Sequence, residues 1–328
     1  MHVLLIKMSS MGDLIHTLPA LTDAMQAIPD LEIDWVVEPA FADIPAWHPA
    51  VKNIIPIPLR RWRKNIFRSI FSGEIIKFYK TLRQKKYDLI VDVQGLFKSA
   101  MVANLARGET HGYDNISARE YIAGYFYRHK YAVPKVKDAH AVVRARTLFS
   151  KTLNYKLPKT RPNFHIDFTK LPALDFLLPE KYVVFLHGTT WESKHYPEIY
   201  WRQLVDKVDT LGITVFLLWG NEVEKNRAER LAKDSQHAKV LPKLSITQIA
   251  TLLKNATAVV AVDTGLGHLS AALTTPTIGL YGPTDPKLVG IVGDNQFYMQ
   301  AQFPCAPCYA TIGPDKVWTL LEKIIGEK

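Results

Sequence analysis

The sequence predicts an α/β protein made of two similarly built domains, each with a parallel sheet. Its 328 residues are 48% hydrophobic and 22% charged, an ordinary globular composition, and this length suggests two domains. Short apolar runs alternate with stretches of helical character through both halves of the chain. The alternation breaks in a proline-rich stretch at residues 154–181, which we interpret as the connection between the domains.

The first half begins with a strand that leads through a polar loop into a helix. Residues 2–7 (HVLLIK) form a continuous apolar run, as expected of a buried parallel strand. Apolar residues from Leu14 to Ile28 recur at steps of three and four, which predicts an amphipathic helix. Residues 32–38 and 87–95 predict further strands, and the basic segment Leu59–Phe71 lies between them.

The second half resumes the same alternation. Strands are predicted at residues 182–190, 213–220, 256–265 and 276–286. Helices are predicted at residues 196–208, 221–234, 266–275 and 315–325. We therefore expect one domain at 1–165, a second at 166–312, and a C-terminal helix at 313–328 that could pack back on the first domain.

The net charge of +10 belongs to the first half of the chain. Residues 1–170 contain 26 Lys and Arg against 15 Asp and Glu, whereas residues 171–328 contain 15 and 16. A one-sided positive field attracts nucleic acid, an anionic lipid surface or a phosphorylated substrate. The alternative is a solvated surface that is basic without a ligand.

Targeting and redox signals are sparse. No stretch approaches the roughly 18 consecutive apolar residues of a membrane-spanning helix, and the apolar start is too short for a signal peptide. We therefore expect a soluble cytoplasmic protein. The two cysteines, Cys305 and Cys308, form a C-x-x-C pair without a second pair or an H-x-x-x-H nearby, so a structural or incidental pair is favoured over a zinc or redox site.

Ligands bind outside the carboxyl ends of the strands in open α/β sheets, so the loops that follow strands are the candidate sites. One of them contains Ser9, Ser10 and Gly12 and ends at Asp13, where a helix should begin. Asp is a preferred N-cap residue, and it could equally be a general base that takes a proton from an attacking hydroxyl. The helix N-terminus and nearby Lys7 would lower the pKa of Asp13, which makes it a weak base.

Three loops of the second half offer groups suited to a nucleotide. Asp263, Thr264 and Gly265 join a strand to a helix whose free N–H groups could bind phosphate, with His268 one turn further on. The other two loops offer hydroxyls and a lysine for a diphosphate, and carboxylates for sugar hydroxyls: Thr189, Thr190, Lys194, Glu222 and Glu224. Each has a plain alternative, namely an ordinary turn, a solvated lysine, or a glutamate favoured by the helix dipole.

The glycine motifs of two nucleotide-binding classes, the dinucleotide-binding and the P-loop proteins, are missing from the sequence. Gly265-x-Gly267-x-x-Ser270 lacks the third glycine of the dinucleotide fingerprint, and the first strand–helix turn of that domain has no G-x-G. There is also no G-x-x-x-x-G-K-[ST] motif. Nicotinamide and P-loop chemistry are therefore disfavoured.

Several of these segments together resemble the lipopolysaccharide heptosyltransferases. The similar motifs occur in family order along nearly the whole chain: KMSSMGDLIHTLPAL (7–21), RRWRK (60–64), DVQGLFKSA (92–100), VDTGLGHLSAAL (262–273) and YGPTDP (281–286). The resemblance is greatest to the enzymes that add the first heptose of the inner core. It implies the GT-B fold, in which two Rossmann-like doubly wound domains face a central cleft. The resemblance makes 1–165 the acceptor-binding domain and 166–312 the nucleotide-sugar-binding domain.

The resemblance also implies the reaction and its partners. Such enzymes transfer L-glycero-D-manno-heptose from ADP-heptose, a co-substrate, to a Kdo residue of Kdo2-lipid A, and they invert the anomeric centre. Neither a metal nor another cofactor is expected, and nucleic acid is not an expected partner. The enzyme would be peripheral on the cytoplasmic face of the inner membrane, and Leu59–Phe71, with basic residues beside Trp62, Phe67 and Phe71, suits an interfacial contact or an ordinary packed helix.

Residue roles carry over from the matching motifs. Asp13 corresponds to the proposed base of the family. Donor contacts are implied for Ser9, Ser10, Thr189, Thr190, Lys194, Glu224, Leu244, Asp263, Thr264, Gly265 and His268. Acceptor contacts are implied for Arg60, Arg61, Arg63, Lys64, Arg119 and His140.

Three alternatives remain beside this interpretation. A later heptosyltransferase or another ADP-sugar transferase would have the same donor loops, since acceptor choice lies in irregular basic loops. A basic nucleic-acid-binding protein is suggested by the pI near 9.4, although no such motif is visible. A nicotinamide oxidoreductase is disfavoured by the missing fingerprint.

Overall fold

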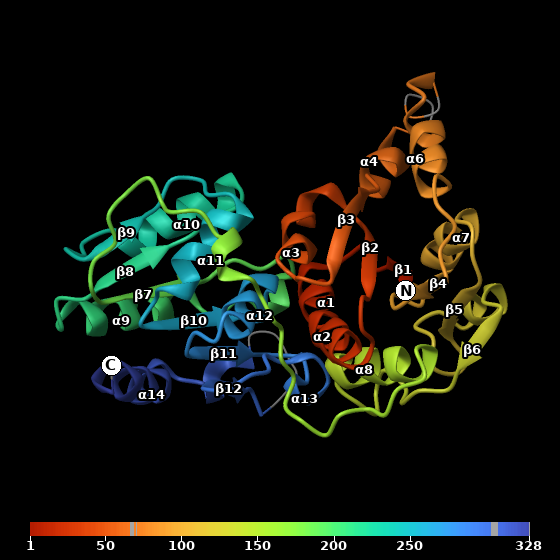
Figure 1. The fold of residues 1–328 in the computed structure, drawn as a ribbon. Coiled ribbons are helices and arrows are strands. Elements are labelled where there is room, and N and C mark those ends of the chain that lie inside the picture. The colour runs from red at the N-terminus through yellow and green to blue at the C-terminus, as the bar shows by residue number, and fades with distance from the viewer. Residues whose placement is uncertain (66–68, 70, 303–307, 328) are drawn as a thin grey trace. The chain divides into compact units, whose positions relative to one another are not determined.

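The computed structural model describes residues 1–327 apart from 66–68, 70 and 303–307 (Figure 1). The chain divides into two compact units, Met1–Phe168 and Thr169–Lys328. The division lies within the proline-rich stretch of the sequence. Cys305 and part of the basic segment 59–71 lie outside the described residues.

The first unit is built on a six-stranded parallel sheet with the order β3-β2-β1-β4-β5-β6. The strands are β1 (His2–Ile6), β2 (Glu32–Val37), β3 (Val51–Pro56), β4 (Leu89–Asp92), β5 (Thr110–Tyr113) and β6 (His129–Tyr131). Residues Val3 to Ile6 of β1 have no exposed surface, because helices cover both faces of this central strand.

The helices of this unit are α1 (Met11–Ile15), α2 (Leu18–Ala27), α3 (Asp43–Ala46), α4 (Leu59–Lys64), α6 (Glu74–Leu82), α7 (Phe97–Leu105) and α8 (Ala141–Thr152), with 3₁₀ turns η1 (Pro39–Phe41) and η2 (Tyr121–Phe126). The single helix predicted from Leu14 to Ile28 is wrong. It is split at His16 and Thr17, because Pro19 has no N–H to continue the hydrogen bonding of α1 and instead sits in the first turn of α2.

Helix α8 lies along α2 (Figure 1), and a buried ion pair joins the two. Arg146 Nε donates to Asp23 Oδ2 over 2.6 Å, and both side chains are almost fully buried. Removing one partner of such a pair costs about 3–5 kcal/mol, because the other charge is left buried. The pair therefore fixes α8 beside the start of the chain, where the functional loop after β1 lies.

The second unit repeats the same topology. Its strands are β7 (Tyr182–Leu186), β8 (Thr214–Leu217), β9 (Ala238–Val240), β10 (Ala258–Val262), β11 (Thr277–Tyr281) and β12 (Gln296–Gln300), all parallel in the order β12-β11-β10-β7-β8-β9. Counted from the first strand of the unit, this is the 3-2-1-4-5-6 order of the first sheet. The prediction of two Rossmann-like doubly wound domains is therefore confirmed.

The helices of the second unit are α9 (Glu198–Asp209), α10 (Glu222–Ala232), α11 (Ile246–Lys254), α12 (Gly265–Ala272), α13 (Pro286–Val289) and α14 (Pro314–Gly326), with 3₁₀ turns η3 (Phe168–Lys170), η4 (Glu192–Lys194) and η5 (Cys308–Thr311). The helix predicted at the end of the chain is present as α14. Val317, Leu321 and Ile324 of α14 belong to the core of the second unit, where α14 lies against α9. Among the described residues, no helix has the length and apolar character needed to cross a bilayer.

Each sheet has a switch point, where the chain order reverses between neighbouring strands. In the first unit it lies between β1 and β4, and in the second between β7 and β10. The loops that leave these strands at their carboxyl ends diverge there and leave room for a ligand. Asp13 follows β1, whereas Thr189, Lys194 and Asp263 follow β7 and β10.

Candidate active site

Asp13 lies in the first turn of α1, three residues after the N-cap. Ser10 is the N-cap, so the expectation that Asp13 caps the helix itself is corrected. The Asp13 Oδ2 atom accepts hydrogen bonds from the backbone N–H of Ser10 over 3.1 Å and from its hydroxyl over 3.0 Å. This capping arrangement fixes the carboxylate rotamer and leaves its other oxygen facing the loop after β1.

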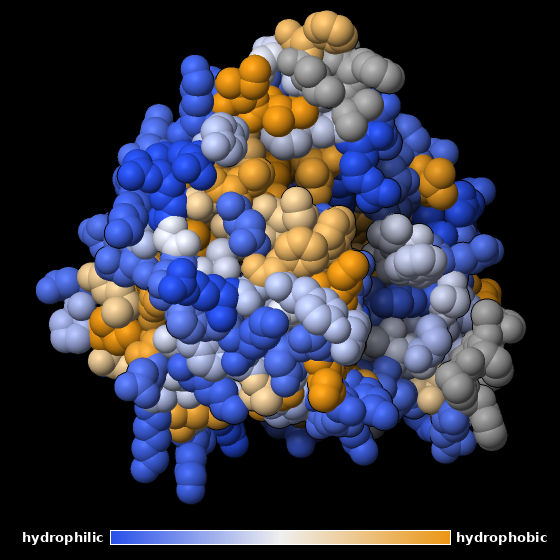
Figure 2. All heavy atoms as spheres, turned by 90° about the vertical axis from the view of Figure 1, so that its right-hand side faces the viewer, coloured by the Kyte–Doolittle hydropathy of each residue, from blue (hydrophilic) through white to orange (hydrophobic). Residues whose placement is uncertain are grey.

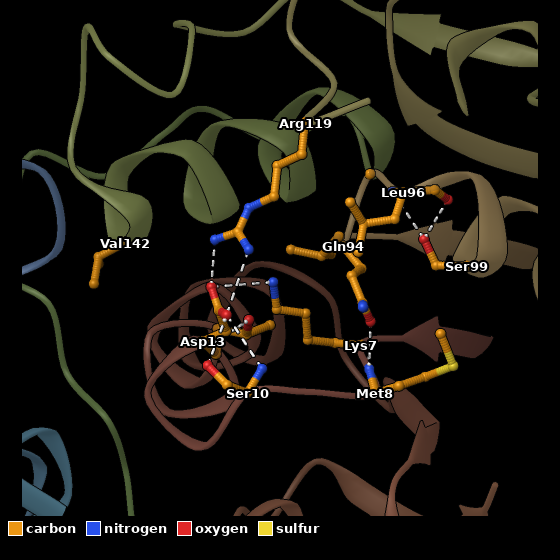
Figure 3. A network of polar contacts seen from close by, with 12 residues as sticks. Lys7, Met8, Ser10, Asp13, Gln94, Leu96, Ser99, Arg119 and Val142 are labelled. Atoms are coloured by element: carbon orange, nitrogen blue, oxygen red, sulfur yellow. Dashed lines mark hydrogen bonds and ion pairs between the residues drawn. The ribbon is translucent and has the colours of Figure 1, made fainter. Parts of the chain in front are cut away.

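Two cations hold that other oxygen. Arg119 Nη2 donates to Asp13 Oδ1 over 2.5 Å, and Lys7 Nζ lies 3.5 Å from the same atom (Figure 3). The Lys7 side chain is almost fully buried, and that of Asp13 is 16% exposed. The structure therefore brings together a carboxylate from the loop predicted to be functional and an arginine 106 residues away in sequence.

The charges in this cluster set its protonation. Burial alone would raise the pKa of Asp13, but the charges of Lys7 and Arg119 and the Ser10 hydrogen bond hold that pKa well below its usual range. Burial lowers the pKa of Lys7 to about 8, although Asp13 partly opposes this shift. At neutral pH the resting site therefore contains an ionised carboxylate with a net excess of positive charge.

The loop after β4 is hydrogen-bonded to the segment that follows β1. Gln94 Oε1 accepts the N–H of Met8 over 2.8 Å (Figure 3), which ties this loop to the end of β1. Asp92 is fully buried and accepts the N–H groups of Gln94 and Gly95 and the hydroxyl of Tyr127. The hydrogen bond between Gln94 and Met8 crosses the switch point and holds the backbone beside Lys7 in place.

A small pocket opens beside Asp13 within the first unit. Its polar lining includes Lys7, Asp13, His16, Gln94, Arg119 and Arg144. The Arg144 guanidinium lies over the Tyr113 ring at 5.0 Å and donates to the carbonyl oxygens of Pro134 and Ser117. With more cations than anions and an ionised carboxylate, this pocket suits an anionic ligand that also brings a hydroxyl.

The predicted acceptor residues have separate positions. His140 is the N-cap of α8, and its ring meets that of His16 edge-on at 5.1 Å, next to the pocket. The basic residues of α4 follow β3 instead. Arg60 stacks over Phe41, and Arg61 pairs with Glu74 over 2.5 Å, while Arg63 is exposed. Lys64 is exposed as well. Arg119 and His140 thus lie at the Asp13 pocket, and the α4 residues form a basic surface of their own.

The second unit places a lysine and a carboxylate at its switch point. Lys194 Nζ lies 2.6 Å from Asp263 Oδ2, and Thr189 Oγ1 donates to the backbone oxygen of Asp263 over 3.1 Å. The Tyr309 hydroxyl donates to the backbone oxygen of Lys194 over 2.9 Å. These contacts link the loops after β7 and β10, so Lys194 is held at the strand ends.

Helix α12 begins beside this ion pair. Thr264 is its N-cap, and its hydroxyl makes no capping hydrogen bond, so the hydroxyl is available to a ligand. The first N–H groups of the helix, starting at Gly265, have no intrahelical partner because of helix geometry. Together with Lys194 they form an anion-binding arrangement. His268 lies one turn on and is buried, with 7% of its surface exposed.

Glu224 joins the loops after β7 and β8. Its Oε2 atom accepts the N–H of Gly220 over 2.7 Å, and a side chain at Gly188 would come within 2.8 Å of its carboxyl carbon. The absence of a side chain at Gly188 leaves room for this carboxylate at the strand ends. Leu244 is half-buried in the loop before α11, whereas Thr190 is exposed.

The predicted residues thus fall into two groups, one in each unit. Several residues of the first site have no role predicted from the sequence, among them Gln94, Asp92 and Arg144. Gln94 had a usable signal, since it follows a predicted strand and lies in one of the family-like motifs. Arg144 had none, because its position depends on how α8 packs.

Comparisons with known proteins identify the family to which the chain is similar. Residues 75–317 match the profile of glycosyltransferase family 9 (heptosyltransferase). Lipopolysaccharide heptosyltransferase 1 of Pseudomonas aeruginosa is 50% identical over 309 residues, which cover 94% of this chain and 86% of that protein.

Two solved structures are similar over almost the whole chain. The E. coli heptosyltransferase WaaC with ADP superposes with a TM-score of 0.91 at 45% identity, covering 99% of this chain and 100% of that one. The same E. coli protein with ADP-2-deoxy-2-fluoro heptose gives a TM-score of 0.88 at 45% identity, covering 98% and 99%. The predicted GT-B class, with its two doubly wound domains, is confirmed by this likeness.

Proposed function

Because the chain belongs to glycosyltransferase family 9, the heptosyltransferases, we propose that it transfers L-glycero-D-manno-heptose from ADP-heptose to a Kdo residue of Kdo2-lipid A. The donor is supported by the similar E. coli structures with ADP and with a fluorinated ADP-heptose. The acceptor is supported by the observation that carries the proposal: an ionised carboxylate, Asp13, in the helix that follows β1, beside two cations.

The proposed reaction is a single displacement with inversion. The Kdo hydroxyl oxygen attacks the anomeric carbon of the heptose as the bond from that carbon to the ADP oxygen breaks, and the bonding pair leaves with ADP. Asp13 accepts the hydroxyl proton. A general base that is well placed contributes about 10²–10⁴-fold to such a step.

Arg119 resolves the conflict between this role and the low pKa of Asp13. In the resting site its guanidinium stabilises the ionised carboxylate, which weakens Asp13 as a base. Kdo is a sugar acid, so an acceptor carboxylate offers Arg119 a second bidentate partner. When Arg119 turns to the acceptor, Asp13 loses part of its stabilisation and its pKa rises as the hydroxyl arrives.

The leaving diphosphate is stabilised in the second unit. Lys194 supplies a positive charge, and the N-terminus of α12 with Thr264 supplies hydrogen-bond donors. In this proposal Glu224 accepts hydrogen bonds from the ribose hydroxyls, and Leu244 contacts the adenine. In this proposal the chain's own cation and donors neutralise the developing charge, so turnover requires neither a metal nor another cofactor.

The experiment that tests this function is a transfer assay with defined acceptors. Purified protein is given ADP-heptose and either Kdo2-lipid A, Kdo-lipid A or an acceptor that already contains the first heptose, with and without EDTA. Mass spectrometry should show one added heptose on the Kdo acceptors with EDTA present. Transfer only to the heptose-containing acceptor would identify a later heptosyltransferase, and dependence on a divalent ion would contradict the metal-free step.

We also propose that the first unit meets an anionic membrane surface as a peripheral protein, on the cytoplasmic face of the inner membrane. A wholly apolar groove lies between α4, α6 and α7, lined by Ile57, Leu59, Trp62, Ile75, Ile76, Phe78, Tyr79, Val102 and Leu105. Figure 2 shows apolar side chains gathered at the top of this face, with hydrophilic ones to either side.

Charge and exposure support a lipid surface as the occupant. Ile76 is 58% exposed and Phe71 is 87% exposed, although both are large apolar residues. Helices α4 and α6, which line the groove, also carry cations, among them Arg63, Lys77 and Lys80. Apolar anchors beside basic side chains are typical of segments that lie in the interface of an anionic leaflet.

A further inference from the structure

Three potential metal ligands lie on one face of the first sheet, at its β5–β6 edge. His111 of β5 and His129 of β6 are direct partners in the parallel pairing of these strands. Glu109 comes two residues before His111, and side chains two apart on a strand point to the same face. The chain therefore places one carboxylate and two imidazoles together through strand register, although His129 is 20 residues from Glu109 in sequence.

The ligand atoms are close enough to share one ion. One ligand atom from each of Glu109, His111 and His129 lies within 4.8 Å of the other two. The two imidazole rings are stacked, with centroids 4.5 Å apart and planes 19° from parallel. His129 Nε2 and Glu109 Oε2 are 2.8 Å apart, so these two atoms need only a small outward movement to admit an ion between them.

One ring nitrogen of His111 is buried without a hydrogen-bond partner among the described residues. The side chain is buried, with 5% of its surface exposed, and its Nδ1 atom lies 3.0 Å from the Tyr131 hydroxyl. Its Nε2 atom has no hydrogen-bond partner among the described residues. A buried polar atom without a partner is unfavourable, and most such atoms in folded proteins are paired or bind water or an ion.

The hydrogen bond to Tyr131 would orient this ring for coordination. If Nδ1 carries the proton and donates to the hydroxyl, Nε2 presents its lone pair, and the ring is fixed by an outer hydrogen bond as in most metal-binding histidines. Burial also lowers the pKa of His111 to about 4, which is consistent with a neutral ring.

We propose that Glu109, His111 and His129 bind one divalent transition-metal ion, with Zn²⁺ the best match to the ligands. Two histidines and one glutamate, with a fourth position left for water, are a zinc ligand set. Arg128 lies 3.3 Å from Glu109 Oε1, but it is largely exposed and leaves the other carboxylate oxygen available.

This site is separate from the heptose-transfer chemistry. None of its three ligands lines the pocket beside Asp13. An ion here would fasten β6, an edge strand of three residues, to β5. The inference therefore concerns metal binding at the sheet edge and holds whether or not the transfer reaction is as proposed.

The test is a Zn²⁺ titration of the untagged full-length chain by calorimetry. It is done in a Cys305→Ser, Cys308→Ser background, because the C-x-x-C pair is a second possible zinc ligand. We expect one Zn²⁺ per chain. His129→Ala, or His111→Ala, should weaken the affinity by at least about tenfold, the lower limit of what the loss of outer-shell partners costs. Co²⁺ in place of Zn²⁺ should give visible absorption that is lost in the same variants.

His237→Ala is the matched control. His237 also pairs with a carboxylate, Asp209, over 3.0 Å, but no third ligand joins the two among the described residues. This variant should bind Zn²⁺ as the parent does. Glu109→Gln, at an exposed position, gives a second reduced-affinity variant if circular dichroism shows that His111→Ala does not fold. No Zn²⁺ binding in the cysteine-free parent, or an affinity in the Glu109 and His129 variants equal to that of the parent, would overturn the proposal.

Discussion

The two units use the same sheet order and place opposite charges at the switch point. In the first unit a carboxylate, Asp13, is held by two cations, Lys7 and Arg119. In the second unit a cation, Lys194, is held by one carboxylate, Asp263, beside the N-terminus of α12. The scaffold fixes where the functional loops lie, and the residues on those loops decide the chemistry.

This difference suits the two halves of the proposed transfer. The first site, with excess positive charge and a proton acceptor, suits an acidic acceptor with a reacting hydroxyl. The second site has a neutral ion pair, and a diphosphate can replace Asp263 as the partner of Lys194. Substitutions at each site should therefore separate chemistry from donor binding.

The largest effect is expected for Asp13→Ala. Without the carboxylate the acceptor hydroxyl has no base, so kcat should fall by about 10³-fold. ADP affinity, which belongs to the second unit, should stay within about twofold of the parent in calorimetry. Turnover is measured from ADP release with saturating donor and acceptor.

Arg119→Lys tests whether Arg119 acts through its two side-by-side nitrogens. A lysine keeps the positive charge near Asp13 but cannot bind two oxygens side by side. If Asp13→Ala retained near-normal kcat, or lost ADP binding together with turnover, the division of roles between the two sites would be wrong.

A smaller effect is expected for Lys194→Ala. The variant loses a charge that stabilises the leaving diphosphate and leaves Asp263 unpaired near it, so kcat/KM for the donor should fall by about 10²-fold. ADP affinity should fall as well, in contrast to Asp13→Ala. Calorimetry with ADP and initial rates at varied donor concentration measure the two effects.

The double variant Lys194→Ala, Asp263→Asn tests the cause of that loss. Removing the carboxylate charge should restore part of the ADP affinity, because the repulsion between Asp263 and the diphosphate is gone. Equal ADP affinity in the single and double variants would show that the ion pair has no part in donor binding.

Much of both sites follows from local sequence. Asp13, Lys194 and Thr264 were predicted because each follows an apolar strand, and the carboxyl ends of parallel strands meet at one edge. The break between α1 and α2 was also readable in principle, since Pro19 marks it. Periodicity alone had joined the two helices.

The rest depends on contacts that no local pattern encodes. Arg119 lies in irregular chain after β5 and reaches Asp13 across 106 residues. The amphipathic pattern of α14 shows that one face is buried but not that α9 is its partner. His111 and His129 become neighbours only through the pairing of β5 with β6. Long-range pairing and packing decide these features.

A third prediction concerns the buried cation of the first site. The pKa of Lys7 is about 8 in the folded protein and 10.5 as its reference value. Between these values the unfolded chain holds more protons, so the Lys7 contribution to stability rises with pH across this window. The rise amounts to about 3 kcal/mol if the whole shift is expressed.

Lys7→Met removes this contribution. From pH 8 to pH 10.5 the free energy of unfolding of the parent should therefore rise relative to that of the variant. Urea denaturation at intervals of half a pH unit measures both. A constant difference across this range would mean that Lys7 is not held as a buried cation beside Asp13.

The smallest effect is expected at the proposed membrane surface, which extends the comparison from the sites to the surfaces of the two units. Ile76→Ser removes an exposed apolar side chain at the groove of the first unit and should weaken binding to vesicles with anionic lipid by about tenfold.

Leu177→Ser is the matched control, because Leu177 is 97% exposed but lies in the second unit. Vesicle sedimentation at two salt concentrations measures both variants, and binding of the parent should weaken at the higher salt because basic side chains take part. Turnover on a soluble, deacylated acceptor should be the same in all three proteins. Equal losses in the two variants would show that the apolar groove between α4, α6 and α7 is not the contact surface.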